Sequence, residues 1–139
     1  MTSLGFDTAP FIYFIGRHPI YVQIMREIVR RVDSGAISGV SSVVTLTEVL
    51  TRPKQIGDTR LEREYQDLLL HGRSCTLAPV DILTAESATD LRARWKLRTP
   101  DALQLATALD AGCQAFLTND TALRRVSDLR ILMLDDSEL

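Results

Sequence analysis

The chain has 139 residues, of which 45 % are hydrophobic and 24 % are charged, and its formal net charge is −2. These values are typical of one globular domain over residues 1–139, and they exclude a strongly basic nucleic-acid-binding protein. Binding of nucleic acid would therefore depend on local basic patches or on metal ions. The first residues lack the basic region of a signal peptide, and the longest apolar run is too short to span a membrane. We therefore expect a cytoplasmic protein without membrane contact.

The cysteines and histidines point to no disulfide and no zinc site. Cys75 and Cys113 are far apart in sequence and lie in apolar surroundings, as reduced core residues of a cytosolic protein do. His18 and His71 have no Cys or His at the spacing of zinc ligands. Any chemistry of this chain must therefore come from other side chains.

Strands alternate with helices along the chain. In the first half we expect strands at 4–6 and 40–44, helices at 10–15 and 19–32, and a helix from Thr45 that ends at Pro53. In the second half we expect helices at 58–70 and 82–97, strands at 75–80, 113–117 and 130–134, and a short helix from Thr121. Pro79 places the end of its strand near a sheet edge. The alternation predicts an α/β domain with a parallel sheet.

The stretch 99–120, TPDALQLATALDAGCQAFLTND, is the most informative. Thr99 is predicted to cap a helix, with Pro100 at its first position and Asp101 in its first turn, where the helix dipole favours an anion. Apolar and small residues then surround the helix, which predicts burial on more than one side. Gly112 is a good end for this helix.

Four carboxylates follow or precede buried strands. Asp7 follows the first strand, Glu48 lies just after the second, Asp101 begins the helix before the fourth, and Asp120 follows that fourth strand. Because the carboxyl ends of parallel strands share one edge of a sheet, we expect these side chains to converge there.

Each acid also has a separate structural explanation. Thr45 and Glu48 match a capping box, and Asp120 can cap the helix that follows it. Asp101 can complement a helix dipole, and Asp7 can close an Asx-turn. Their joint position is what favours a functional site.

Convergence of four acids has an electrostatic consequence. Two carboxylates ~4 Å apart repel by ~4 kcal/mol at an effective dielectric constant near 20, so such a cluster must take up protons or bind cations. Ligands that are all oxygen select hard ions, which predicts Mg²⁺ or Mn²⁺. Two such ions can activate a water and stabilise a leaving oxygen, which hydrolyses a phosphodiester without a His or Cys nucleophile.

The segments FDTAPFIYFIG, SSVVTLTEVL, LRTPDALQLATALDAG and FLTND resemble, in this order, the motifs of the PIN-domain ribonucleases, especially the VapC-type toxins of bacterial toxin–antitoxin pairs. The resemblance covers nearly the whole chain. It implies an α/β fold with a five-stranded parallel sheet flanked by helices on both faces. It also implies Mg²⁺- or Mn²⁺-dependent endoribonuclease activity, a homodimer, and an antitoxin protein that binds across the site.

By this resemblance, the catalytic and metal-binding acids are Asp7, Glu48, Asp101 and Asp120. The resemblance also places Thr118 and Asn119 where they would orient the carboxylates. The chain departs from many relatives after Asp120, where they have a further acid or an aromatic residue and this chain has TALRR. This departure concerns the second metal position and not the first.

Arg98 directly precedes the informative stretch and could contact an RNA phosphate. The alternative is that it belongs to a solvent-exposed ladder of charges at i, i+4 spacing with Arg94. Residues 11–14 are expected to be mostly core, with docking of an antitoxin helix as the alternative. At the level of function, the alternative is a PIN fold that binds RNA or protein without catalysis. A phosphoacceptor receiver domain is not favoured, because Asp7 has no paired acid and no Lys follows Lys96.

Overall fold

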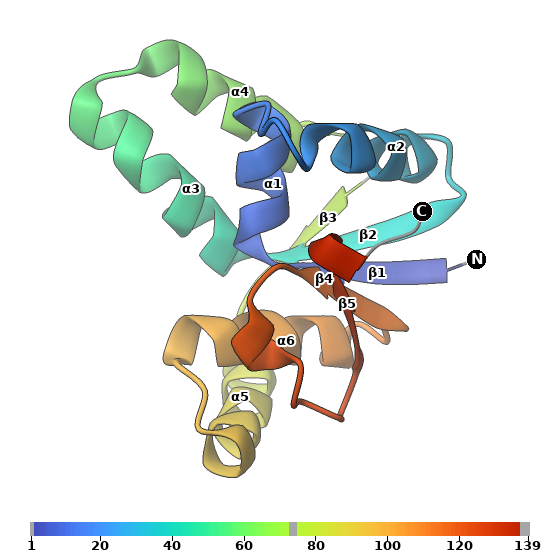
Figure 1. The fold of residues 1–139 in the computed structure, drawn as a ribbon. Helices are drawn as coiled ribbons and strands as arrows, with labels where there is room; N and C mark the ends of the chain where they lie inside the picture. Colours follow the sequence, from blue (N-terminus) through green and yellow to red (C-terminus); the bar gives the residue numbers. More distant parts are fainter. Residues whose placement is uncertain (1, 73–74, 137–139) are drawn as a thin grey trace.

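The computed structural model describes residues 2–72 and 75–136, and within them it forms one α/β domain around a five-stranded sheet (Figure 1). All strand pairs are parallel, in the order β3-β2-β1-β4-β5, which confirms the predicted fold class. In chain order the elements are β1 (Thr2–Phe6), α1 (Thr8–Ile15), α2 (Val22–Asp33), β2 (Ile37–Ser42), α3 (Val43–Ile56), α4 (Thr59–Leu70), β3 (Cys75–Ala78), α5 (Ile82–Trp95), α6 (Thr99–Asp110), β4 (Ala115–Thr118), η1 (Thr121–Leu123), β5 (Arg130–Met133) and η2 (Leu134–Asp136).

Helices cover both faces of the sheet, as expected. Helices α1 to α4 lie on one face, and α5 and α6 lie on the other (Figure 1). Each face has its own buried apolar cluster: Met25 and Ile28 of α2 pack in the first, and Leu91 of α5 and Leu105 of α6 pack in the second. No helix among the described residues is both long and apolar enough to cross a membrane.

Helix α6 packs very closely on β1. A Cβ atom added at Gly5 would lie 2.6 Å from the Cβ of Ala108, so the two elements approach at a distance that only these small residues permit. Gln104 to Ala108 are all buried, which confirms that the helix is covered on more than one side. This contact fixes the start of α6, and therefore Asp101, relative to the end of β1.

The boundary between β2 and α3 differs from the prediction. Strand β2 ends at Ser42, whose side chain caps α3 by accepting a hydrogen bond from the Val44 backbone N–H at 3.1 Å. Thr45 is thus inside the helix and fully buried, and the predicted capping box of Thr45 and Glu48 is wrong. The boundary was misplaced because of Val43. Its β-branched side chain favours a strand locally, but in the structure it directly follows the Ser42 cap and is the first residue of the helix.

Three other helix ends also differ. Pro53 does not end α3, because it lies buried near the last turn and the helix continues until Gly57, with a φ of 70°. Helix α6 is capped by the backbone of Arg98, so Thr99 is its first residue and not its cap. Helix α2 begins three residues after Pro19, because residues 19–21 form a turn in which His18 Nδ1 accepts the Ile20 backbone N–H at 3.1 Å.

Candidate active site

Asp7 lies at the carboxyl edge of the sheet, between β1 and α1. Its backbone N–H donates to the Leu117 carbonyl of β4 at 2.9 Å, so it sits beside the end of that strand. Its Oδ1 accepts from the Thr8 backbone N–H at 2.8 Å and its Oδ2 accepts from the Thr118 hydroxyl at 2.6 Å. Asp7 therefore caps α1, and it does so while only 9 % exposed.

Burial raises the pKa of Asp7 above its ordinary value. The hydrogen bonds from Thr118 and Thr8 act in the opposite direction, and the negative charges of Asp101 and Glu48 raise the pKa further. Asp101 and Glu48 are therefore close enough for their charges to act on the Asp7 carboxyl group. A buried carboxylate of this kind is an expensive anion that a cation would stabilise.

Glu48 faces Asp7 from the second turn of α3. The Thr8 hydroxyl donates to Glu48 Oε1 at 2.7 Å, and Gln104 Nε2 donates to the same oxygen at 2.5 Å. The Thr8 hydroxyl also meets that of Thr45 at 3.1 Å, inside the protein. One oxygen of Glu48 is therefore fixed by two donors.

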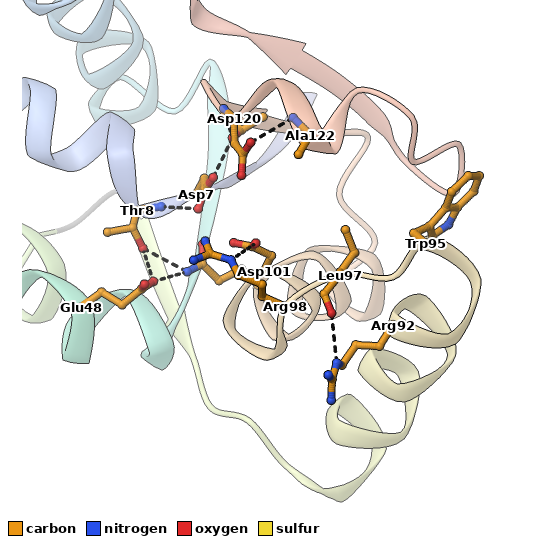
Figure 2. Close-up of polar contacts among 12 residues, drawn as sticks. Asp7, Thr8, Glu48, Arg92, Trp95, Leu97, Arg98, Asp101, Asp120 and Ala122 are labelled. Carbon is orange, nitrogen blue, oxygen red and sulfur yellow. Dashed lines mark hydrogen bonds and ion pairs between the residues drawn. The ribbon is translucent and has the colours of Figure 1, made fainter.

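Asp101 and Asp120 complete the group (Figure 2). Asp101 Oδ2 accepts from Arg98 Nε at 3.2 Å, and the Arg98 side chain is 78 % exposed. Asp120 caps η1 by accepting from the Ala122 N–H at 2.9 Å, and its own N–H donates to the Thr118 hydroxyl at 3.0 Å. Thr118 thus connects Asp120 to Asp7.

The structure brings all four predicted acids to one edge of the sheet. Figure 2 shows the side chains of Asp7, Glu48, Asp101 and Asp120 directed toward the same space. The negative charge of this group also acts on Arg98. The hydrogen bond to Asp101 and the charges of Asp101, Asp120 and Glu48 all raise the pKa of its guanidinium. Glu48 and Asp101 come from helices on opposite faces of the sheet, and Asp7 and Asp120 come from adjacent strand ends.

The group fits a divalent cation in charge and in donor type, since all its ligand atoms would be carboxylate oxygens and one carboxylate is buried. In spacing, no three His, Cys, Asp or Glu side chains of residues 2–72 and 75–136 are arranged to hold one ion together. The carboxylates thus share one electrostatic environment without forming a closed ligand set.

The polar residues around the acids were only partly anticipated. Thr118 contacts Asp7 as the resemblance implies. Asn119 Oδ1 instead accepts from the Asp135 backbone N–H at 3.3 Å, which ties β4 to η2. Sequence reasoning missed Thr8 and Gln104. The available signal for Gln104 was a polar residue within the buried surface of α6, one helical turn after Asp101.

Comparison with known proteins places the chain in a family. Residues 6–129 match the family model of the PIN domain, and the chain belongs to this family. No curated protein sequence matches it.

Solved structures with this fold include three toxin–antitoxin assemblies. VapBC2 from Rickettsia felis, bound to a promoter DNA fragment, has a TM-score of 0.75 at 14 % identity, covering 96 % of this chain and 98 % of that one. DNA-bound VapBC from Salmonella typhimurium has a TM-score of 0.76 at 19 % identity, covering 96 % and 99 %. A toxin–antitoxin complex from Klebsiella pneumoniae has a TM-score of 0.69 at 19 % identity, covering 96 % and 98 %. At these identities the likeness is one of fold.

Proposed function

We propose that this PIN-domain protein is a metal-dependent endoribonuclease that hydrolyses RNA phosphodiester bonds. The observation that carries the proposal is the buried carboxylate of Asp7 at the carboxyl edge of a parallel sheet, where the side chains of Glu48, Asp101 and Asp120 are directed toward the same space (Figure 2). In α/β folds this edge is where ligands bind. No basic side chain bonds to Asp7 within the described residues, so a bound cation is the simplest way to stabilise its charge.

The proposed ligands are the four predicted acids. The ion they would hold is Mg²⁺ or Mn²⁺, and the ligands would be Asp7, Glu48, Asp101 and Asp120. The chemistry that the ion would supply is the activation of a water and the stabilisation of the leaving oxygen. Thr8 and Thr118 keep both oxygens of Asp7 fixed by donating to them. That orientation is present before any ligand binds, which lowers the cost of ordering the site.

Arg98 is the proposed contact to the RNA backbone. Its guanidinium is exposed beside the acids and carries a positive charge at the mouth of an otherwise negative site. There it can bind a phosphate on either side of the bond to be cleaved and offset repulsion between RNA and the carboxylates.

Cleavage of RNA by the purified protein tests the proposal. Cleavage should require Mg²⁺ or Mn²⁺ and stop when EDTA is added. Asp7→Asn and Asp101→Asn should each lower the rate by at least about a hundredfold. Asp110→Asn is the matched control, because Asp110 lies on the same helix as Asp101, is exposed, and has the Ser87 hydroxyl as its one side-chain hydrogen-bond partner among the described residues. Full activity in Asp7→Asn would remove the assignment.

The toxin role is a further part of the proposal. The structural neighbours are VapBC and toxin–antitoxin complexes. The apolar side chains of Ile12 on α1, Ile56 on α3 and Leu70 on α4 are exposed, and these three helices cover the same face of the sheet (Figure 1). An antitoxin helix could bury them. Cys75 and Cys113 are free, which fits a reducing cytoplasm. We also expect a homodimer.

Induced expression tests this role. It should arrest growth, and co-expression of a small antitoxin gene from the adjacent reading frame should restore growth. Sedimentation of the purified chain should give a dimer. Arrest that persists in Asp7→Asn would separate toxicity from cleavage and favour the alternative, a PIN fold that acts by binding alone.

A further inference from the structure

Gln104 is a polar residue within the buried surface of α6. It lies on α6 and is only 2 % exposed. Its Nε2 donates to Thr8 Oγ1 at 3.0 Å and to Glu48 Oε1 at 2.5 Å. Its Oε1 is buried and has no hydrogen-bond partner within the described part of the chain. The side chain thus has both donors engaged and its acceptor unpaired.

The direction of the Gln104 amide follows from its partners. The Glu48 carboxylate can only accept, so the nitrogen end of the amide must face it. The Thr8 hydroxyl gives its proton to Glu48, and its oxygen therefore accepts from Gln104. The reverse orientation would put the amide oxygen against a carboxylate oxygen and leave both donors unused.

Two donors on one oxygen leave the other oxygen of Glu48 available. Thr8 and Gln104 both bind Oε1, and the rest of the Glu48 side chain is exposed. A free glutamate side chain samples several rotamers, and holding it in one costs conformational entropy. The two hydrogen bonds to Oε1 offset this loss of entropy in the protein without a ligand.

We propose that Gln104 is a positioning residue, which holds Glu48 so that Oε2 faces the shared space of the acids. This inference rests on the proposed function for what Oε2 binds. A buried acceptor without a partner is destabilising, so packing alone would favour an apolar residue of the same shape, such as Met or Leu. The unpaired amide oxygen of Gln104 destabilises the fold, whereas the amide nitrogen donates to Glu48 at the candidate site.

The variant Gln104→Met tests the proposal, because Met keeps the length of the side chain and removes both donors and the orphaned oxygen. Its thermal midpoint should stay within about 2 °C of the parent or rise. Binding of Mn²⁺, measured by calorimetry, should weaken about tenfold, as expected when a partner that orients a metal ligand is lost. The kcat for RNA cleavage should fall while KM stays unchanged. A lower midpoint with unchanged Mn²⁺ affinity and kcat would show a purely structural role and overturn the proposal.

A control and a double variant sharpen the test. Thr107→Val removes a buried hydroxyl of the same helix, which donates to the Leu103 carbonyl at 2.8 Å and to no other group of residues 2–72 and 75–136, and it should leave Mn²⁺ affinity unchanged. In a Glu48→Gln background, Gln104→Met should have little further effect on Mn²⁺ affinity, because positioning acts through Glu48. Additive losses of affinity would contradict positioning.

A measurement without metal separates this inference from the proposed function. The ¹³C resonance of the Glu48 carboxyl group should shift in Gln104→Met and not in Thr107→Val. An unchanged resonance overturns the positioning role whether or not the chain binds metal. A parent protein that neither binds Mn²⁺ nor cleaves RNA, but shows this shift, would remove the nuclease and retain the tie between Gln104 and Glu48.

Discussion

At the residue scale, the structural and functional explanations of the acids turn out to be compatible. Asp120 caps η1, as its separate explanation requires, and Asp7 caps α1, a role that differs from the Asx-turn expected for it. Yet the same hydrogen bonds hold both carboxylates at the edge of the sheet, beside Thr118. Backbone N–H groups and hydroxyls thus stabilise a set of anions whose one basic hydrogen-bond partner, within the part of the chain that the structure describes, is Arg98.

The first prediction concerns Arg98. Arg98→Ala should weaken RNA binding across sequences and lower the slope of log affinity against log salt by about one, because one phosphate contact is lost. The check is a fluorescence anisotropy titration with the cleavage-deficient Asp7→Asn background at several salt concentrations. Arg60→Ala is the control, since Arg60 is exposed on α4 and pairs with Glu64, away from the acids. An unchanged slope in Arg98→Ala would assign Arg98 to its ion pair with Asp101 alone.

The residue scale also shows what a single sequence can reveal. The four acids could be located because each stands next to a predicted strand or helix end, where side chains are not needed for packing. Gln104 could not, because its neighbours form an apolar helix surface and its role depends on Thr8 and Glu48, which are 96 and 56 residues away. From sequence alone, Gln104 cannot be told from a polar residue at the partly exposed border of a helix. Its contacts with Thr8 and Glu48 in the structure make the difference.

At the element scale, the order and type of the predicted elements are confirmed, and their ends are less accurate. The strand predicted at 40–44 is β2, which ends at Ser42. Local preference extended it into Val43 and Val44, whereas the Ser42 cap and burial of Thr45 begin α3 there. This places Glu48 in the second turn of α3 instead of the first, where its side chain reaches Thr8 across the edge of the sheet.

The second prediction tests how α6 is seated. Gly5→Ala should lower the free energy of unfolding by about 1–3 kcal/mol, because the new methyl group would lie 2.6 Å from the Ala108 Cβ. Adding Ala108→Gly should recover part of the loss, less the cost of about 1 kcal/mol for a glycine within a helix. Urea denaturation of the two single variants and the double variant gives the coupling. Purely additive losses would show that the two elements separate without strain.

At the scale of the whole molecule, the site is assembled by topology. Strands β1 and β4 are neighbours although their paired positions, such as Leu4 and Ala115, are 111 residues apart in the sequence, and this pairing brings Asp7 beside the segment that leads to Asp120. Periodicity and composition cannot give the order β3-β2-β1-β4-β5, because strand pairing depends on contacts far apart in sequence. The alternation of elements predicted five strands and a parallel sheet but no strand order, and the resemblance to the PIN family supplied the expectation of helices on both faces.

The third prediction follows from this assembly. Burial raises the pKa of Asp7, so at neutral pH its ionised form is less favourable in the folded chain than in the unfolded one. Without divalent ions, Asp7→Asn should therefore raise the free energy of unfolding at neutral pH. With Mn²⁺ at a hundred times its dissociation constant, the parent should gain about 2.7 kcal/mol and Asp7→Asn much less, so the order of stability should reverse.

Urea denaturation with and without Mn²⁺ measures this reversal, and Asp110→Asn should follow the parent in both conditions. Asp7 and Asp120 follow the ends of β1 and β4, and Glu48 and Asp101 lie on α3 and α6, so an ion held among them would link elements from both faces of the sheet and from most of the chain. Its binding should therefore move the whole unfolding transition, read by far-UV circular dichroism and by Trp95 fluorescence alike. Equal stabilisation of Asp7→Asn and the parent would place the ion elsewhere. A shift in one probe alone would mean that the site stabilises a single element and not the domain.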